Sequence, residues 1–172
     1  VREAIKLLSY EGLVSTTKQG MVVHGFSEED LYKLYEVRYM LEWFCFAHLP
    51  QSAVGKVVEQ LDMVVDKMEL ALAHQDFQEF SLQDVQFHNS IFEAVDHKYI
   101  RLLWENIKGL CQTTLYVGTK KRFEQGDYEF KREVVAQHRN IVDGLRRGDR
   151  KQVEVLLKEH FKHNCWIEMN QI

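Results

Sequence analysis

Residues 76–95 read DFQEFSLQDVQFHNSIFEAV, and their apolar side chains recur at intervals of three and four residues. These intervals are those of one side of an α-helix. The side consists of Phe77, Phe80, Asp84, Phe87, His88, Ile91 and Val95. Asp84 and His88 interrupt it one turn apart, where a core helix normally carries hydrocarbon. The segment therefore predicts a core helix that also carries ionisable groups.

Five further helices are expected from residue 27 onward. They are separated by Pro50, which is the single proline, by polar stretches and by turns such as Gly148-Asp149. Ser27, with Asp30 three residues later, resembles a helix capping box. The expected helices span residues 27–48, 52–74, 76–95, 97–122, 128–147 and 149–170. Helices joined by short turns pack as antiparallel neighbours, so the sequence predicts an all-α fold, an antiparallel six-helix bundle.

The residues before this bundle have a different pattern. Residues 2–11 predict a short helix, and two β-prone runs at 13–17 and 21–24 flank Lys18-Gln19-Gly20, as in a hairpin. We therefore expect residues 1–26 to form a small unit of their own, ahead of a helical domain at 27–172.

The composition is that of an ordinary intracellular globular domain. The chain has 172 residues, 45% hydrophobic and 28% charged, with a formal net charge of −4. This total does not suggest a free-standing nucleic-acid binder, which normally has a basic excess. No run is long and apolar enough for a membrane helix, and no signal-peptide pattern is present. Three widely spaced cysteines indicate reduced thiols and a cytoplasmic protein. The chain begins at Val1, inside an expected helix, as a fragment would.

Two more histidines lie on apolar helix faces. In residues 128–147 the face is Val134, His138, Ile141 and Leu145, and in residues 149–170 it is Val153, Leu157, His160, Asn164 and Ile167. His138 precedes Gly148 by ten residues, and His160 follows Asp149 by eleven. If these helices form an antiparallel hairpin, both imidazoles lie about 15 Å from the turn and can face each other.

Asp84, His88, His138 and His160 thus form a candidate first shell for a divalent transition metal, with coordination positions left for water or a ligand. Taken singly, each residue has an ordinary explanation. An Asp–His pair one turn apart is often a surface ion pair, and a core histidine is usually hydrogen-bonded to a backbone carbonyl. Four such residues on three apolar faces at matching heights favour a site, because burying them unpaired is costly.

Arg38 interrupts another apolar face, which consists of Leu31, Leu34, Tyr35, Arg38, Leu41 and Cys45. A guanidinium in this position needs an anion. Two partners are open: Glu42, one turn further along the same helix, or a carboxylate ligand held by two parallel hydrogen bonds.

These residues also carry a resemblance to a known family. The start of the chain resembles the C-terminal half of a GntR-type winged helix, and the rest resembles the FCD effector domain of the FadR branch. The first likeness rests on Val1-Arg2-Glu3-Ala4, Leu7-Leu8, Glu11-Gly12-Leu13-Val14 and Gly20-Met21-Val22-Val23. The second rests on Asp30-Leu31, Arg38-x-x-x-Glu42, Asp84-x-x-Phe87-His88-x-x-Ile91-x-x-Ala94, His138-Arg139-x-Ile141, Gly148-Asp149 and His160. Six bundle helices indicate the VanR-like subgroup.

The resemblance implies a bacterial transcription regulator, truncated at its N-terminus, rather than an enzyme. Such proteins form homodimers, bind operator DNA and respond to a small metabolite. In metal-binding members an Asp and three His hold the ion, here Asp84, His88, His138 and His160, and an organic acid completes its coordination. Zinc is the first candidate, with nickel, manganese and iron as alternatives. Arg38 would bind the acid, and Arg2, Lys18 and Gln19 match DNA-contacting positions.

Gln137 and His97 depart from the family pattern, and neither is expected to touch the ligand set.

Two other function classes are alternatives to a transcription regulator. A metal-dependent enzyme on a helical scaffold is disfavoured because the chain has no His-Asp dipeptide, no Glu-x-x-His, no HExxH and no Gly-rich phosphate loop. A dimerisation module without a metal remains the third hypothesis.

Overall fold

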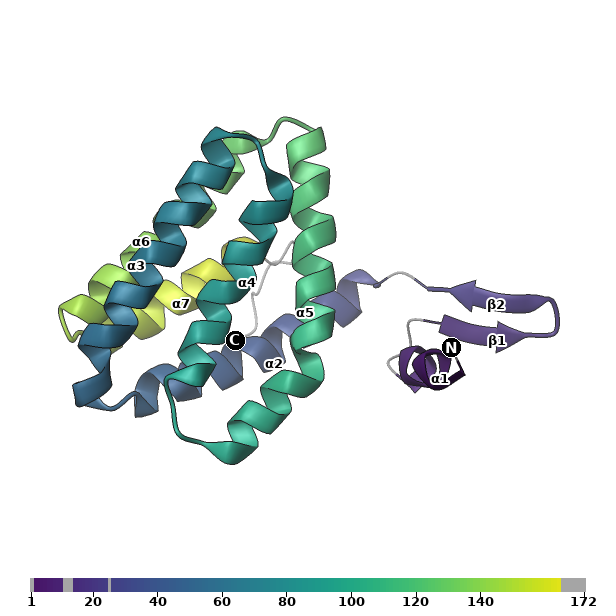
Figure 1. Cartoon of the computed structure of the whole chain (residues 1–172), viewed down its shortest axis with the longest axis horizontal. Coiled ribbons are helices and arrows are strands. Elements are labelled where there is room, and N and C mark those ends of the chain that lie inside the picture. Colours follow the sequence, from purple (N-terminus) through teal and green to yellow (C-terminus); the bar gives the residue numbers. More distant parts are fainter. Residues whose placement is uncertain (1, 11–13, 25, 165–172) are drawn as a thin grey trace.

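The structure is a computed structural model that describes residues 2–10, 14–24 and 26–164. Two short strands and seven helices are present in this part of the chain (Figure 1). In order they are α1 (Arg2–Tyr10), β1 (Val14–Thr17), β2 (Gly20–Val23), α2 (Glu28–His48), α3 (Gln51–Ala73), α4 (Phe77–Glu93), α5 (Lys98–Glu124), α6 (Tyr128–Arg146) and α7 (Arg150–Asn164).

The first elements form a helix and a hairpin. Strands β1 and β2 pair antiparallel, with Val14 opposite Val23 and Thr17 opposite Gly20. Gly20 has a φ of +132°, a region that favours glycine, where the chain leaves the turn. Figure 1 shows α1 beside this hairpin and both to one side of the bundle. The expected helix, strand, turn and strand are therefore present, although Gly12 and Leu13 lie outside the described residues.

Side-chain caps set the starts of several bundle helices. Ser27 and Asp30 form the expected capping box at the start of α2, because each side chain accepts a hydrogen bond from the other residue's backbone N–H. Asp76 accepts from Gln78 N and Glu79 N at the start of α4. His97 caps α5 in the same way, since its Nδ1 accepts from Ile100 N at 3.2 Å.

Helix α4 lies in the middle of the bundle, where it packs against α2, α3 and α5. Two of its core side chains, Phe80 and Phe87, are 0% exposed. Trp104 of α5 stacks on Phe92 with the ring centroids 4.3 Å apart, and its Nε1 donates to Asn89 Oδ1 at 3.0 Å. The prediction of a core helix at residues 76–95 is confirmed.

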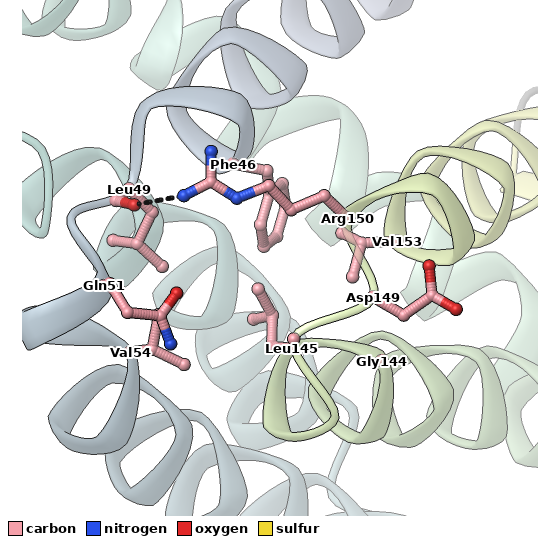
Figure 2. A pocket seen from close by; sticks show the side chains of 10 residues that line it. Phe46, Leu49, Gln51, Val54, Gly144, Leu145, Asp149, Arg150 and Val153 are labelled. Atoms are coloured by element: carbon pink, nitrogen blue, oxygen red, sulfur yellow. Dashed lines mark hydrogen bonds between the residues drawn. The ribbon is translucent and has the colours of Figure 1, made fainter.

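Helices α6 and α7 form the expected antiparallel hairpin, and its turn is fastened to α2. Gly148 has a φ of +70° in this turn. The guanidinium of Arg150 donates to Ala47 O at 2.7 Å and to Leu49 O at 3.1 Å, so it satisfies carbonyls that α2 leaves open at its end. Figure 2 shows the bond to Leu49. The cavity beside Arg150 measures about 20 Å³, room for about one water molecule.

The six bundle helices, α2 to α7, confirm the all-α prediction. Their bounds differ from the expected ones by two residues or fewer wherever the structure describes them. The expected continuation of the last helix to residue 170, with Ile167 on its apolar face, lies outside the described residues. None of the helices in the described ranges is long and apolar enough to cross a membrane.

Candidate metal centre

Three helices bring their histidines together inside the bundle. His88 of α4, His138 of α6 and His160 of α7 are 0%, 0% and 3% exposed. Nε2 of His88 lies 3.3 Å from Nε2 of His138, and the rings of His138 and His160 have centroids 4.4 Å apart. One potential ligand atom from each imidazole lies within 4.8 Å of those from the other two.

Asp84 lies beside two of the three histidines. Its Oδ1 lies 3.3 Å from Nε2 of His88 and 3.6 Å from Nε2 of His138. This oxygen is buried, and within the described ranges no group makes a hydrogen bond of good geometry to it. The structure therefore brings together the four residues that the sequence singled out. We call them the donor cluster below.

The outer nitrogen of each imidazole has an acceptor oxygen. Nδ1 of His88 lies 2.7 Å from Oε2 of Glu42, and Nδ1 of His138 lies 2.8 Å from Val134 O. Nδ1 of His160 lies 3.1 Å from Oε1 of Gln137. An acceptor at Nδ1 favours the proton there, which leaves the Nε2 lone pair of a neutral ring free for a metal. All three rings are thus held as metal ligands usually are.

Two of these outer contacts differ from the expectations. Gln137 was expected not to touch the ligand set, and that expectation was wrong, because its side chain reaches His160 across the α6–α7 hairpin. His97 is the other residue that departs from the family pattern, and its side chain caps α5. Glu42 was considered only as a partner of Arg38, whereas its second oxygen also holds His88. The sequence feature that could have identified Glu42 is its position beside Leu41 and one turn before Cys45 and Phe46, which predicts a buried side chain.

Arg38 and Glu42 form a buried ion pair, with Nε of Arg38 donating to Oε1 of Glu42 at 2.9 Å. The two side chains are 2% and 0% exposed. The guanidinium lies over the ring of Phe161 at 5.1 Å. Its Nη2 is buried and has no hydrogen-bond partner in the part of the chain that the structure describes. Of the two partners open for Arg38, Glu42 is present, and one donor nitrogen remains for a further acceptor.

Burial and mutual charge set the protonation of the donor cluster. Burial raises the pKa of Asp84, but the polar contact with His88 and the charge of His138 outweigh it, so the pKa ends well below its usual range. Burial lowers the pKa of His138 to about 4, against an opposing contribution from Asp84. It also lowers the pKa of His160 well below its usual value. At neutral pH these residues are a carboxylate and two neutral imidazoles, the forms that bind metals.

The residues present fit a divalent transition metal. Two nitrogens that each lie about 2.1 Å from one ion are about 3.0 Å apart at a right angle and about 3.4 Å apart at the tetrahedral angle. The 3.3 Å between the Nε2 atoms of His88 and His138 falls within this interval. Three imidazoles and one carboxylate also match the preferences of zinc, nickel, manganese and iron.

The residues expected to contact DNA lie in the helix–hairpin unit. Arg2 is the first residue of α1, and Lys18 with Gln19 forms the turn between β1 and β2. All three side chains are exposed. The backbone N–H of Gln19 donates to Thr17 Oγ1 at 3.2 Å, which helps to shape the turn.

Comparisons with known proteins agree with this architecture. The family model described as the FCD domain matches residues 33–163. The gluconate operon transcriptional repressor of Bacillus subtilis (strain 168) is 30% identical over 161 residues, which are 94% of this chain and 66% of the relative. The repressor of the same name from Bacillus licheniformis is 29% identical over the same shares. This chain thus spans about two thirds of the length of these relatives.

Solved structures share the fold. E. coli McbR/YncC superposes with a TM-score of 0.75 at 20% identity, over 100% of this chain and 84% of that one. A putative transcriptional regulator GntR from Rhodococcus sp. RHA1 superposes with a TM-score of 0.65 at 21% identity, over 94% and 74%. Identities this low speak for the fold alone.

Proposed function

This chain belongs to the FCD domain family, and from that premise we propose that it is the ligand-sensing part of a GntR-type transcription regulator. One observation carries the proposal. Three buried imidazoles hold their Nδ1 atoms on acceptors, and the Nε2 atoms of His88 and His138 lie 3.3 Å apart beside Oδ1 of Asp84. A packing role alone does not require this arrangement, whereas a metal site does.

In this proposal Asp84, His88, His138 and His160 hold one divalent ion, with zinc as the first candidate. When bound, the ion supplies positive charge and an attachment point for an acid at the centre of the bundle. The protein's part is to keep the rings oriented. Glu42, Val134 O and Gln137 do so from outside the donor cluster, and apolar side chains such as Phe87 exclude water.

The effector we propose is a small organic acid, whose carboxylate also accepts a hydrogen bond from Nη2 of Arg38. Two facts support an acid. The nitrogen is buried without a partner among the described residues, and its guanidinium is already fixed by Glu42 and the Phe161 ring. A preorganised donor of this kind favours a planar carboxylate. The two relatives are repressors of a gluconate operon, so gluconate is the first acid to test.

Effector binding would act on DNA through the N-terminal unit. We assign residues 1–26 to a winged-helix DNA-binding domain and 27–172 to the effector-binding and dimerisation domain. Arg2, Lys18 and Gln19 would contact operator DNA in a homodimer. An acid that binds one arrangement of the two domains more tightly shifts the population toward it, and the difference in affinity limits the size of that shift.

A thermal-shift screen tests this function on the chain as it stands. Organic and sugar acids are added to protein loaded with zinc, with Asp84→Ala as the control. We expect at least one acid to raise the unfolding temperature only when metal is present, and the Asp84→Ala variant not to respond. Equal responses with and without metal would remove the metal from the proposal. Turnover of the acid by loaded protein would favour the metal-dependent enzyme instead.

A further inference from the structure

Lys131 is a buried lysine that the donor cluster does not use. It lies in the first turns of α6 and is 5% exposed. Its Nζ donates to Oγ1 of Thr119 at 2.9 Å and lies 5.0 Å from the centre of the Phe80 ring. Within the described ranges, no carboxylate lies within 4.0 Å of this ammonium. A buried ammonium with only neutral partners is costly to keep, so this one calls for an explanation.

Lys131 lies on the same interior side as the donor cluster. Phe80 stands one turn before Asp84 on α4, and Lys131 stands two turns before His138 on α6. Asp84 and His138 are in contact at 3.6 Å. Lys131 and His138 therefore lie along one interior face of α6.

Helix α6 gives the spacing between Lys131 and the donor cluster. Lys131 precedes His138 by seven residues, which correspond to about 10 Å along the helix. A six-carbon chain with a contact of about 3 Å at each end bridges a separation of this size.

We propose that Lys131 and Thr119 bind the far end of the effector, and that the effector is therefore an acid with a second oxygen-rich group. The inference rests on the proposed function, because the first carboxylate binds beside Asp84 and Arg38. An ammonium has three donors, and one of them is used by Thr119. The other two fit a second carboxylate or the terminal hydroxyls of a sugar acid.

Three acids of equal chain length test this inference by calorimetry on zinc-loaded protein. Adipate has a second carboxylate, gluconate has hydroxyls, and hexanoate has neither. We expect adipate or gluconate to bind at least tenfold more tightly than hexanoate, and the tighter of the two identifies the chemistry of the far end. Lys131→Met should remove this preference and leave zinc content and hexanoate binding unchanged. Thr119→Val should weaken the preference without abolishing it.

Lys120→Met is the matched control, because Lys120 is an exposed lysine on α5. It should bind all three acids as the unaltered chain does. A preference that survives Lys131→Met would overturn the inference, as would the absence of any preference in the unaltered chain. If the unaltered chain binds no zinc, or binds none of the acids although it holds zinc, the proposed function fails as well. Those results are distinct from a failure confined to the far end.

Discussion

Oε2 of Glu42 lies 2.7 Å from Nδ1 of His88, and Oε1 of the same carboxylate accepts from Nε of Arg38 at 2.9 Å. One buried carboxylate thus connects α2 to α4 and joins the candidate acid-binding arginine to a candidate metal ligand. Burial raises the pKa of Glu42, but the contact with His88 and the charge of Arg38 outweigh it, so the pKa ends below its usual value and the carboxyl stays ionised. This contact makes several parts of the site depend on each other.

Glu42→Gln should weaken zinc binding about 10- to 100-fold, because a neutral amide orients the His88 ring less strongly and makes its Nε2 a poorer ligand. It should also lower the free energy of unfolding by about 3–5 kcal/mol, since Arg38 is left buried without a countercharge. Competition with a chelator measures the first effect and urea unfolding the second. The exposed Glu59, changed to Gln, is the control, and zinc affinity equal in the two variants would contradict the role of Glu42.

The contact between Gln137 and His160 can be tested in a similar way. Gln137→Leu removes the acceptor at Nδ1 of His160 and should lower zinc affinity about 10-fold or more. Gln137→Glu should retain or raise it, because a carboxylate makes the imidazole more basic. Gln152→Leu, on the exposed side of α7, controls for the loss of an amide. If all three variants bind zinc equally, His160 does not depend on this contact.

Oδ1 of Asn89 accepts a hydrogen bond from Nε1 of the buried Trp104 at 3.0 Å. Asn89→Ala leaves this buried N–H without its acceptor, which should cost about 1–3 kcal/mol of the free energy of unfolding. Chemical denaturation followed by tryptophan fluorescence measures it. Asn106→Ala removes an exposed asparagine from α5 and should cost far less. Equal losses would mean that the bond to Trp104 contributes little.

The stability of the protein should depend on pH through Lys131. Burial lowers the pKa of its ammonium to about 8, whereas an unfolded lysine titrates near 10.4. Above about pH 8 the unfolded chain therefore holds a proton that the folded chain releases, so this group makes the folded state more stable as the pH rises. Well below pH 8, at about pH 7 and lower, both states are protonated and the group adds almost no pH dependence.

From pH 7 to pH 9 the gain from Lys131 is about 1 kcal/mol. Urea unfolding at both values should show it as a difference between the unaltered chain and Lys131→Met, in which it is absent. Lys120→Met should behave like the unaltered chain. A Lys131→Met variant with the same pH dependence as the unaltered chain would place the titration elsewhere.

The sequence predicted the helices and the donor cluster because both follow from local periodicity. The interruptions at Asp84, His88, His138 and His160 stand on apolar faces, and the turn at Gly148 sets the relative heights of the last two. These relations need only the pitch of a helix and one hairpin. They could be worked out before any packing was known.

The outer contacts could not be predicted in the same way. Whether Glu42 pairs with Arg38, with His88 or with both depends on how α2 crosses α4, and periodicity carries no crossing angle. Gln137 is off the apolar face of α6, and only its side-chain conformation brings it to His160. Lys131 was overlooked because a lysine in the first turns of a helix is usually solvated.

The metal content of the purified chain decides whether the donor cluster is a metal site. The chain is purified without added chelator, dialysed against a mixture of zinc, nickel, manganese and iron salts, freed of unbound ions, and measured by elemental analysis beside His88→Ala and His160→Ala. We expect about one transition-metal ion per unaltered chain and almost none in either variant, with an unfolding temperature that a chelator lowers only for the unaltered chain. Equally low metal in all three proteins, with no response to chelator, would contradict it.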